Sequence, residues 1–198
     1  HPFISTMANM LVIFGLVTYA TKGVSFGAIE PAIPKMIIPK INGFPTIILW
    51  AVAAIVIVWF IWNKTTFGKN LYAVGGNPEA AAVSGISVFG VTMGAFILAG
   101  ILYGFGSWLE CARMVGSGSA AYGQGWEMDA IAACVVGGVS FTGGIGKISG
   151  VVVGVLIFTV LIYSLTILGI DTNLQFVFEG IIIITAVTLD CLKYVQKK

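Results

Sequence analysis

The chain has 198 residues, of which 58% are hydrophobic and only 9% are charged, well below the roughly 25% charged share of soluble domains. Its formal net charge of +2 is dispersed, which excludes the clustered basic surface that nucleic-acid binding needs. Cys111, Cys134 and Cys191 lie far apart and lack the CxxC spacing of zinc or redox sites, so we interpret them as small buried side chains. The composition predicts an all-α integral membrane protein.

The first apolar run predicts a helix over residues 3–20, followed by an extramembrane loop over 21–45 that holds four prolines. Residues 46–62 are apolar without interruption and just long enough to span a membrane. The chain opens at His1 with no initiator methionine and no signal-peptide pattern, from which we expect further helices to precede it.

The next stretch, residues 63–87, is polar and contains a short helix signal. Asn77, Pro78 and Glu79 read as an N-cap, a first helical position and a first-turn acid, and Gly85 is placed to end the helix. We therefore predict a helix over residues 78–84 that lies outside the membrane.

The remaining sequence predicts one clear span, one weak segment and a helical hairpin. The span covers residues 88–109, where Gly100 and Gly104 have the four-residue spacing that permits close helix packing in lipid. Residues 130–139 are apolar but too few for a full span, which favours a broken or partly re-entrant segment. Residues 148–168 and 174–189 form the hairpin, so we expect about six transmembrane or partly re-entrant helices in all.

The lysines predict an orientation. With the C-terminus in the cytoplasm, short cytoplasmic loops carry Lys64, Lys69, Lys147, Lys193, Lys197 and Lys198, whereas Arg113 is the basic residue of the short opposite loops. Lys22, Lys35 and Lys40 lie in or beside the longer first loop. This count requires segment 130–139 to cross, or nearly cross, toward the cytoplasm.

Several polar or glycine-rich positions are candidates for a translocation path. A carboxylate such as Glu179 within a bilayer costs about 2.5 kcal/mol unless it faces a partner or water, although a snorkelling side chain is an equal alternative. Glu127 and Asp129 fit a helix start more simply than acid-base chemistry. The glycine-rich stretch 137–147 is either a packing turn or part of the path. The candidates are Glu127, Asp129, Gly137, Gly138, Ser140 and Glu179, and we predict no catalytic or metal-binding set.

Two motifs carry a family resemblance. Residues 68–86, GKNLYAVGGNPEAAAVSGI, resemble the cytoplasmic loop of ribose/galactoside-type ABC sugar importer permeases. Residues 127–138, EMDAIAACVVGG, with SFTGGIG at 140–146, are similar to a second signature of that family. The resemblance extends over essentially the whole chain. It implies that residues 1–198 of this sequence correspond to the C-terminal part of one larger polytopic permease domain.

The resemblance implies a multi-pass permease subunit of an ATP-binding-cassette importer for a monosaccharide or simple glycoside, located in the bacterial inner membrane. It implies a homodimer with a second permease copy, a cytoplasmic ATPase that holds ATP and Mg²⁺, and an extracytoplasmic sugar-binding protein. This chain would need no cofactor of its own. The predicted helix at 78–84 would be the cytoplasmic coupling helix, with the ATPase-coupling residues Asn77, Pro78, Glu79, Ala80, Ala81 and Gly85.

An ion-coupled secondary transporter of a small polar solute is the alternative. It would place charged groups or broken helices near the middle of the membrane and would need no ATPase. Only Glu179 and the region of residue 130 offer features of that kind.

Overall fold

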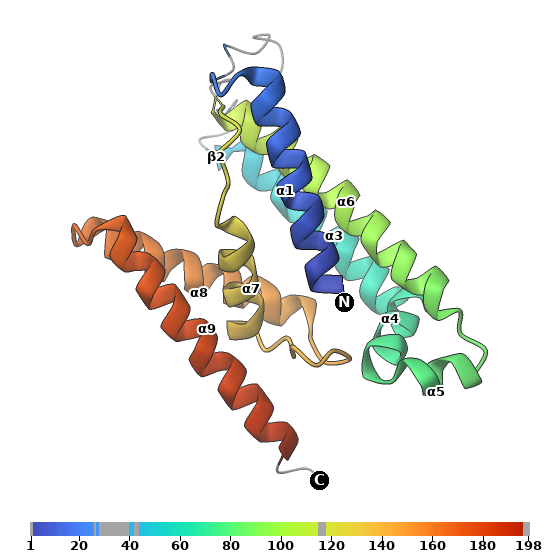
Figure 1. Ribbon diagram of the computed structural model, residues 1–198. Coiled ribbons are helices and arrows are strands. Elements are labelled where there is room, and N and C mark those ends of the chain that lie inside the picture. The colour runs from blue at the N-terminus through green and yellow to red at the C-terminus, as the bar shows by residue number, and fades with distance from the viewer. Residues whose placement is uncertain (1, 26, 28–39, 42–43, 115–117, 196–198) are drawn as a thin grey trace. The chain divides into compact units, whose positions relative to one another are not determined.

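The computed structural model describes residues 2–25, 27, 40–41, 44–114 and 118–195 (Figure 1). Expected features at 28–39, Gly116, Ser117, Lys197 and Lys198 lie outside these residues. The helices are α1 (Pro2–Thr21), α3 (Thr46–Lys64), α4 (Thr66–Gly76), α5 (Pro78–Val83), α6 (Val88–Arg113), α7 (Trp126–Val136), α8 (Ile148–Ile167) and α9 (Thr172–Val195). Two-residue strands β1 (Lys40–Ile41) and β2 (Phe44–Pro45) form an antiparallel hairpin just before α3.

Four helices among the described residues are long and apolar enough to cross a membrane: α1, α3, α6 and α8. Helix α9 has a shorter apolar part, Thr172–Thr185, and α7 has only 11 residues. The predicted all-α membrane protein with about six transmembrane or partly re-entrant helices is confirmed. No part of the apolar windows of α1 and α3 is buried within the chain, so their side chains are available to lipid or to other helices.

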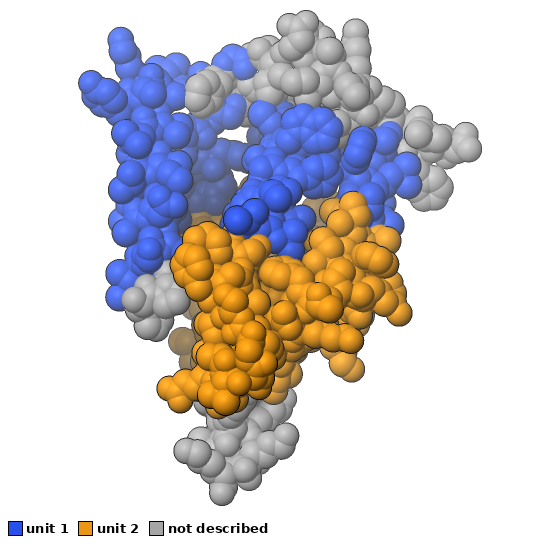
Figure 2. Space-filling model, turned by 90° about the vertical axis from the view of Figure 1, so that its right-hand side faces the viewer, with its two compact units in different colours: residues 1–53, 97–124 blue, residues 54–96, 125–198 orange. Residues whose placement is uncertain are grey.

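The chain divides into two compact units, coloured separately in Figure 2. Unit 1 comprises residues 1–53 and 97–124, and unit 2 comprises residues 54–96 and 125–198. The boundaries fall within α3, within α6 and just before α7. All candidate coupling and path residues belong to unit 2.

The core of unit 2 is formed where α7 packs against both α8 and α9. Ala132 and Ala133 of α7 are buried with Phe158 of α8, and isoleucines of α8 and α9 cover them, namely Ile162, Ile182 and Ile183. This small apolar core fixes the position of the short helix α7 between two longer helices.

Glycines bring α7 and α8 into backbone contact. A Cβ atom on Gly137 would lie 2.5 Å from the carbonyl oxygen of Gly150, and one on Gly154 would lie 2.6 Å from the nitrogen of Gly137. Ala133 and Gly137 are four residues apart, as are Gly150 and Gly154, which is the small-residue spacing that allows close helix approach in lipid.

The small residues of α6 behave differently from the sequence expectation. A Cβ on Gly94 would meet the Phe67 ring at 2.7 Å, but within the described structure no atom lies within 4 Å of a Cβ placed on Gly100 or Gly104. In unit 1 the same helix instead contributes Phe105 and Trp108 to an aromatic cluster with Trp50, whose ring centroid lies 5.9 Å from that of Trp108. Among the described residues, the close helix packing expected of α6 is therefore found between α7 and α8 instead.

Helix α4 is an element that the sequence analysis missed. Its three glycines argue against a helix, yet Thr65 caps its first turn by accepting a hydrogen bond from the Gly68 nitrogen at 3.3 Å. A side chain at Gly68 would collide with the Trp62 backbone, so glycine permits the sharp turn from α3 into α4. The polar stretch between two spans is thus a pair of helices, α4 and α5.

Candidate functional site

Helix α5 has the capped ends that the sequence predicts. The Asn77 side-chain oxygen accepts a hydrogen bond from the Ala80 nitrogen at 3.0 Å, Pro78 occupies the first turn, and Glu79 supplies the first-turn acid. At the other end, Ile86 N–H donates to the Ala81 carbonyl at 3.0 Å, across Gly85 at φ +81°. Both ends are therefore fixed by local hydrogen bonds, which a six-residue helix needs to be ordered.

The exposure of α5 separates its inner residue from its outer ones. Ala81 is only 4% exposed and packs against its own chain, whereas Val83 is 91% exposed. Glu79, Ala80 and Ala82 are also exposed. The free surface of α5 is small and apolar, with one acid.

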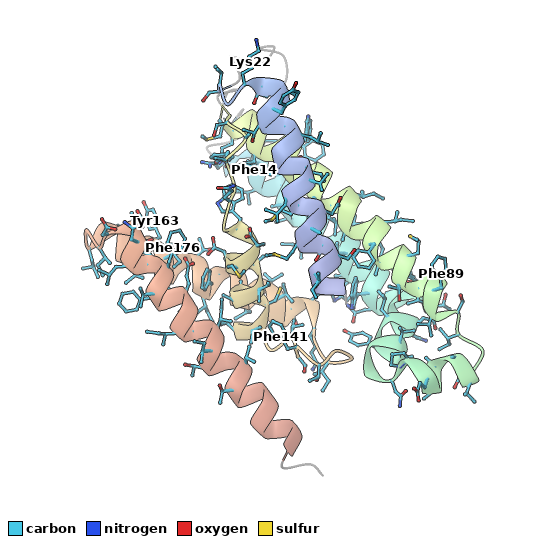
Figure 3. All side chains as sticks on the ribbon, viewed as in Figure 1. Phe14, Lys22, Phe89, Phe141, Tyr163 and Phe176 are labelled. Atoms are coloured by element: carbon cyan, nitrogen blue, oxygen red, sulfur yellow. The ribbon has the colours of Figure 1, made fainter. Side chains whose placement is uncertain are left out.

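The glycine-rich stretch 137–147 forms an ordered turn between α7 and α8. Gly138 ends α7 at φ +82°, where Val139 N–H donates to the Cys134 carbonyl at 3.0 Å. Ser140 is 8% exposed; its Oγ lies 2.8 Å from the Thr142 Oγ1, and its N–H donates to the Ile145 carbonyl at 3.0 Å. Phe141, labelled in Figure 3, is an exposed residue of this turn.

This turn contacts α4. The Tyr72 hydroxyl donates to the Gly146 carbonyl at 2.6 Å, and the backbones of Gly75 and Gly144 touch. Beside the contact lies an open cavity of about 620 Å³, lined by Trp59, Asn63, Tyr72 and residues 137–138 and 144–150. The end of α3 and the start of α8 therefore lie at the same end of unit 2.

Two carboxyl groups lie together where α7 meets α9. Glu179 of α9 is 7% exposed, and the half-buried Asp129 of α7 lies close enough to interact with it electrostatically. One turn earlier on α9, Gln175 is 6% exposed and donates to Thr166 Oγ1 at 3.3 Å and to the Ile170 carbonyl at 3.1 Å. These groups form a polar site within apolar helices.

The other candidate path residues do not join this pair. Glu127 accepts a hydrogen bond from the Gly125 nitrogen at 3.1 Å, which is the helix-start role that the sequence favours. Gly137 is in contact with α8, while Gly138 and Ser140 belong to the turn. Among the residues that the structure describes, no group of three or more His, Cys, Asp or Glu side chains could hold a metal ion.

The sequence analysis missed Tyr72, Gly75, Gly143 and Gly144. Their only signal is that each motif of the resemblance contains a Gly-Gly pair, and nothing in one sequence indicates that the two pairs meet. The contact depends on α4, which was not predicted.

Comparison with known proteins matches residues 1–187 to the family described as the permease component of the branched-chain amino acid transport system. The chain therefore belongs to this family of transport permeases. A related protein, the galactose/methyl galactoside import permease of Treponema pallidum (strain Nichols), is 56% identical over 207 residues, covering 100% of this chain and 39% of that protein.

Two further relatives are also sugar import permeases. The galactose/methyl galactoside import permease of Escherichia coli (strain K12) is 44% identical over 100% of this chain and 60% of that protein. The ribose import permease of Bacillus subtilis (strain 168) is 38% identical over 96% of this chain and 59% of that protein. The resemblance to ribose/galactoside-type permeases is confirmed. The chain spans between 39% and 60% of the length of these relatives. No solved structure matches the chain.

Proposed function

We propose that this chain is part of the transmembrane permease subunit of an ATP-driven importer for galactose and methyl-galactosides. The 56% and 44% identity to two galactose/methyl galactoside import permeases supports the substrate class. The permease would work as a homodimer in the bacterial inner membrane, with a sugar-binding protein outside and an ATPase in the cytoplasm that holds ATP and Mg²⁺. This chain would then perform no covalent chemistry.

One observation carries the mechanism: a doubly capped helix, α5, lies between two spans with an exposed apolar surface. Val83 is 91% exposed and lies beside the exposed Ala80 and Ala82, so together they form an apolar surface that a partner protein could cover. A short helix with small side chains fits a groove on a partner, which is a common mode of recognition. We assign α5 as the cytoplasmic coupling helix, with Glu79, Ala80, Ala82 and Val83 as its contact surface and Asn77, Pro78 and Gly85 as its caps. The buried Ala81 holds the helix to its own chain.

The cytoplasmic assignment rests on charge. Lys64, Lys69 and Lys147 belong to the end of unit 2 where α3 ends and α8 begins, and lysines favour the cytoplasmic side of short loops. Helix α9 returns from the opposite end after the turn at Gly169, which would place the C-terminus in the cytoplasm too.

The path is proposed to pass the carboxyl pair. Asp129 and Glu179 are the ionisable residues that the structure brings together on apolar helices of unit 2, and such residues within membrane segments commonly mark a substrate pathway. Carboxyl oxygens are suitable acceptors for sugar hydroxyl groups. The other candidates are proposed to shape the path indirectly, Glu127 through the α7 start and Gly137, Gly138 and Ser140 through the turn.

The test compares Val83→Asp with Val24→Asp in the assembled transporter that contains this chain. Both valines are largely exposed, at 91% and 67%; Val83 ends α5 in unit 2, whereas Val24 follows α1 in unit 1. At matched membrane abundance, we expect Val83→Asp to abolish ATPase copurification and sugar uptake, and Val24→Asp to retain both. Glu79→Arg should weaken association in the same assay.

Two results would contradict the proposal. Equal ATPase association of Val83→Asp and the unmodified protein would remove α5 as the docking site. Sugar uptake without any copurifying ATPase, driven instead by an ion gradient, would replace the importer with the secondary-transporter alternative.

A further inference from the structure

Besides the Tyr72 hydrogen bond, the contact between α4 and the 137–147 turn is made by backbone against backbone. A Cβ on Gly75 would lie 2.8 Å from the Gly144 nitrogen, one on Gly143 would lie 2.5 Å from the Gly75 carbonyl oxygen, and one on Gly144 would lie 2.7 Å from the Gly76 Cα. Real Cβ atoms do not approach so closely. The backbones of α4 and the turn can therefore touch only because these positions are glycine. We call this the glycine contact, formed by Gly75, Gly143 and Gly144.

The glycine contact is tied to α5 through a single residue. The Asn77 N–H donates to the Ala73 carbonyl at 3.1 Å and ends α4, while the Asn77 side chain accepts from the Ala80 nitrogen at 3.0 Å and begins α5. One residue thus caps both helices, and no flexible linker separates them. A displacement of α5 is therefore expected to move the end of α4, where Gly75 lies.

On its other side, the glycine contact is tied to α7 and α8. The turn is closed by its own hydrogen bonds, and the Tyr72 hydroxyl holds the Gly146 carbonyl at 2.6 Å, next to the start of α8. Helices α7 and α8 are in backbone contact through Gly137 and Gly150, so they cannot slide past each other without losing that packing. Helix α7 then carries Asp129, which lies beside Glu179 where α7 packs against α9.

We infer that Tyr72, Gly75 and Gly144 are positioning residues that transmit movement of α5 to the Asp129–Glu179 pair, a role that rests on the proposed importer function. The glycine contact and the Tyr72 bond supply the physical connection between the two ends of unit 2. Side-chain packing would absorb small displacements by changing rotamers, whereas backbone against backbone has no such freedom. A static packing role would hold the fold together equally well but would not affect how much sugar moves per ATP.

The experiment measures sugar imported per ATP hydrolysed in proteoliposomes that hold the assembled transporter. Gly75→Ala places a methyl group against the Gly144 nitrogen, and Gly76→Ala is its matched control, since no described atom lies within 4 Å of a Cβ there. We expect Gly75→Ala to keep ATPase copurification and ATP hydrolysis while its sugar-to-ATP ratio falls about tenfold, within the range of measured coupling between sites. Gly76→Ala should keep the unmodified ratio.

Tyr72→Phe decides the matter if Gly75→Ala does not accumulate in the membrane. It removes only the hydroxyl that bonds the Gly146 carbonyl, and we expect a reduced ratio at normal abundance. A ratio equal to that of the unmodified protein in Tyr72→Phe, or equal ratios in Gly75→Ala and Gly76→Ala, overturns the inference. Failure of the unmodified complex to couple uptake to ATP would instead overturn the proposed function, so the two failures are distinguishable.

Discussion

Replacing Glu179 by Leu tests the carboxyl pair by leaving Asp129 without its partner. Glu179 is 7% exposed, so the substitution itself suits the apolar surroundings. The cost falls on the half-buried Asp129, whose carboxyl group then faces the apolar layer without its polar neighbour. An unsatisfied buried polar group costs about 1–3 kcal/mol, and an ionised carboxylate at the membrane centre costs at least about 2.5 kcal/mol. We therefore expect a loss of about 2 kcal/mol in the free energy of unfolding.

The assay is a double-mutant cycle measured by unfolding the purified protein in mixed micelles. Glu179→Gln keeps a donor toward Asp129 and should cost less than about 1 kcal/mol, because single hydrogen bonds in membrane proteins contribute about 0.6 kcal/mol on average. The double variant Asp129→Leu with Glu179→Leu should recover most of the loss. An equal loss in Glu179→Gln and Glu179→Leu, or additive effects of the two leucine substitutions, would refute the idea that the two carboxyl groups depend on each other.

Three further predictions concern packing, capping and an exposed hydrogen bond. Gly154→Ala, which places a Cβ 2.6 Å from the Gly137 nitrogen, should cost about 1–3 kcal/mol of unfolding free energy; Gly180→Ala, with no described atom within 4 Å, should be neutral or stabilising in the same micelle assay. Asn77→Ala removes the cap of α5 and should destabilise that helix by about 1 kcal/mol, seen as faster amide exchange of α5, with Asn77→Asp as the conservative control. The hydrogen bond to Glu110 raises the pKa of Tyr122, so the bond is present at neutral pH and is lost as pH rises through that raised pKa. A tyrosinate absorbance titration compared with Tyr122→Phe should therefore place Tyr122 above the ordinary range for tyrosine, and titration within that range would contradict the assignment.

The parts of the fold that a single sequence could predict are those with a local cause. The spans follow from uninterrupted apolar runs, and the α5 bounds follow from Asn77 and Pro78 at one end and Gly85 at the other. The prediction of 78–84 differs from Pro78–Val83 only because Ser84 is the C-cap. Helix α4 was missed because its three glycines lower its intrinsic helix propensity. One of them, Gly75, is needed for the contact with the distant backbone of Gly144. Tertiary structure decided that element against its local signal.

The site was predictable to the same extent. Glu127 serves the helix start, as its position suggests, whereas Asp129 and Glu179, which lie side by side, are fifty positions apart and have no local signal. The glycine-rich turn left two interpretations open from sequence. The structure favours packing at Gly137, which touches Gly150, but also brings the neighbouring Gly143 and Gly144 to α4. The long-range partner of each glycine, rather than the glycine itself, determines its role.

The depth of the carboxyl pair follows from the lengths of the helices on either side. With 11 residues, α7 is about 16 Å long, roughly half of the hydrocarbon thickness of a membrane. The 137–147 turn that follows α7 contacts α4. The N-terminal end of α7, which holds Asp129, is therefore expected to lie near the middle of the layer. Counted from the opposite side, Glu179 is seven residues, or about 10 Å, beyond the start of α9 at Thr172. Both counts place the pair well inside the membrane, at the open N-terminal end of a short helix. A polar pair at the end of a short helix is stable at this depth only next to protein or a water-filled path.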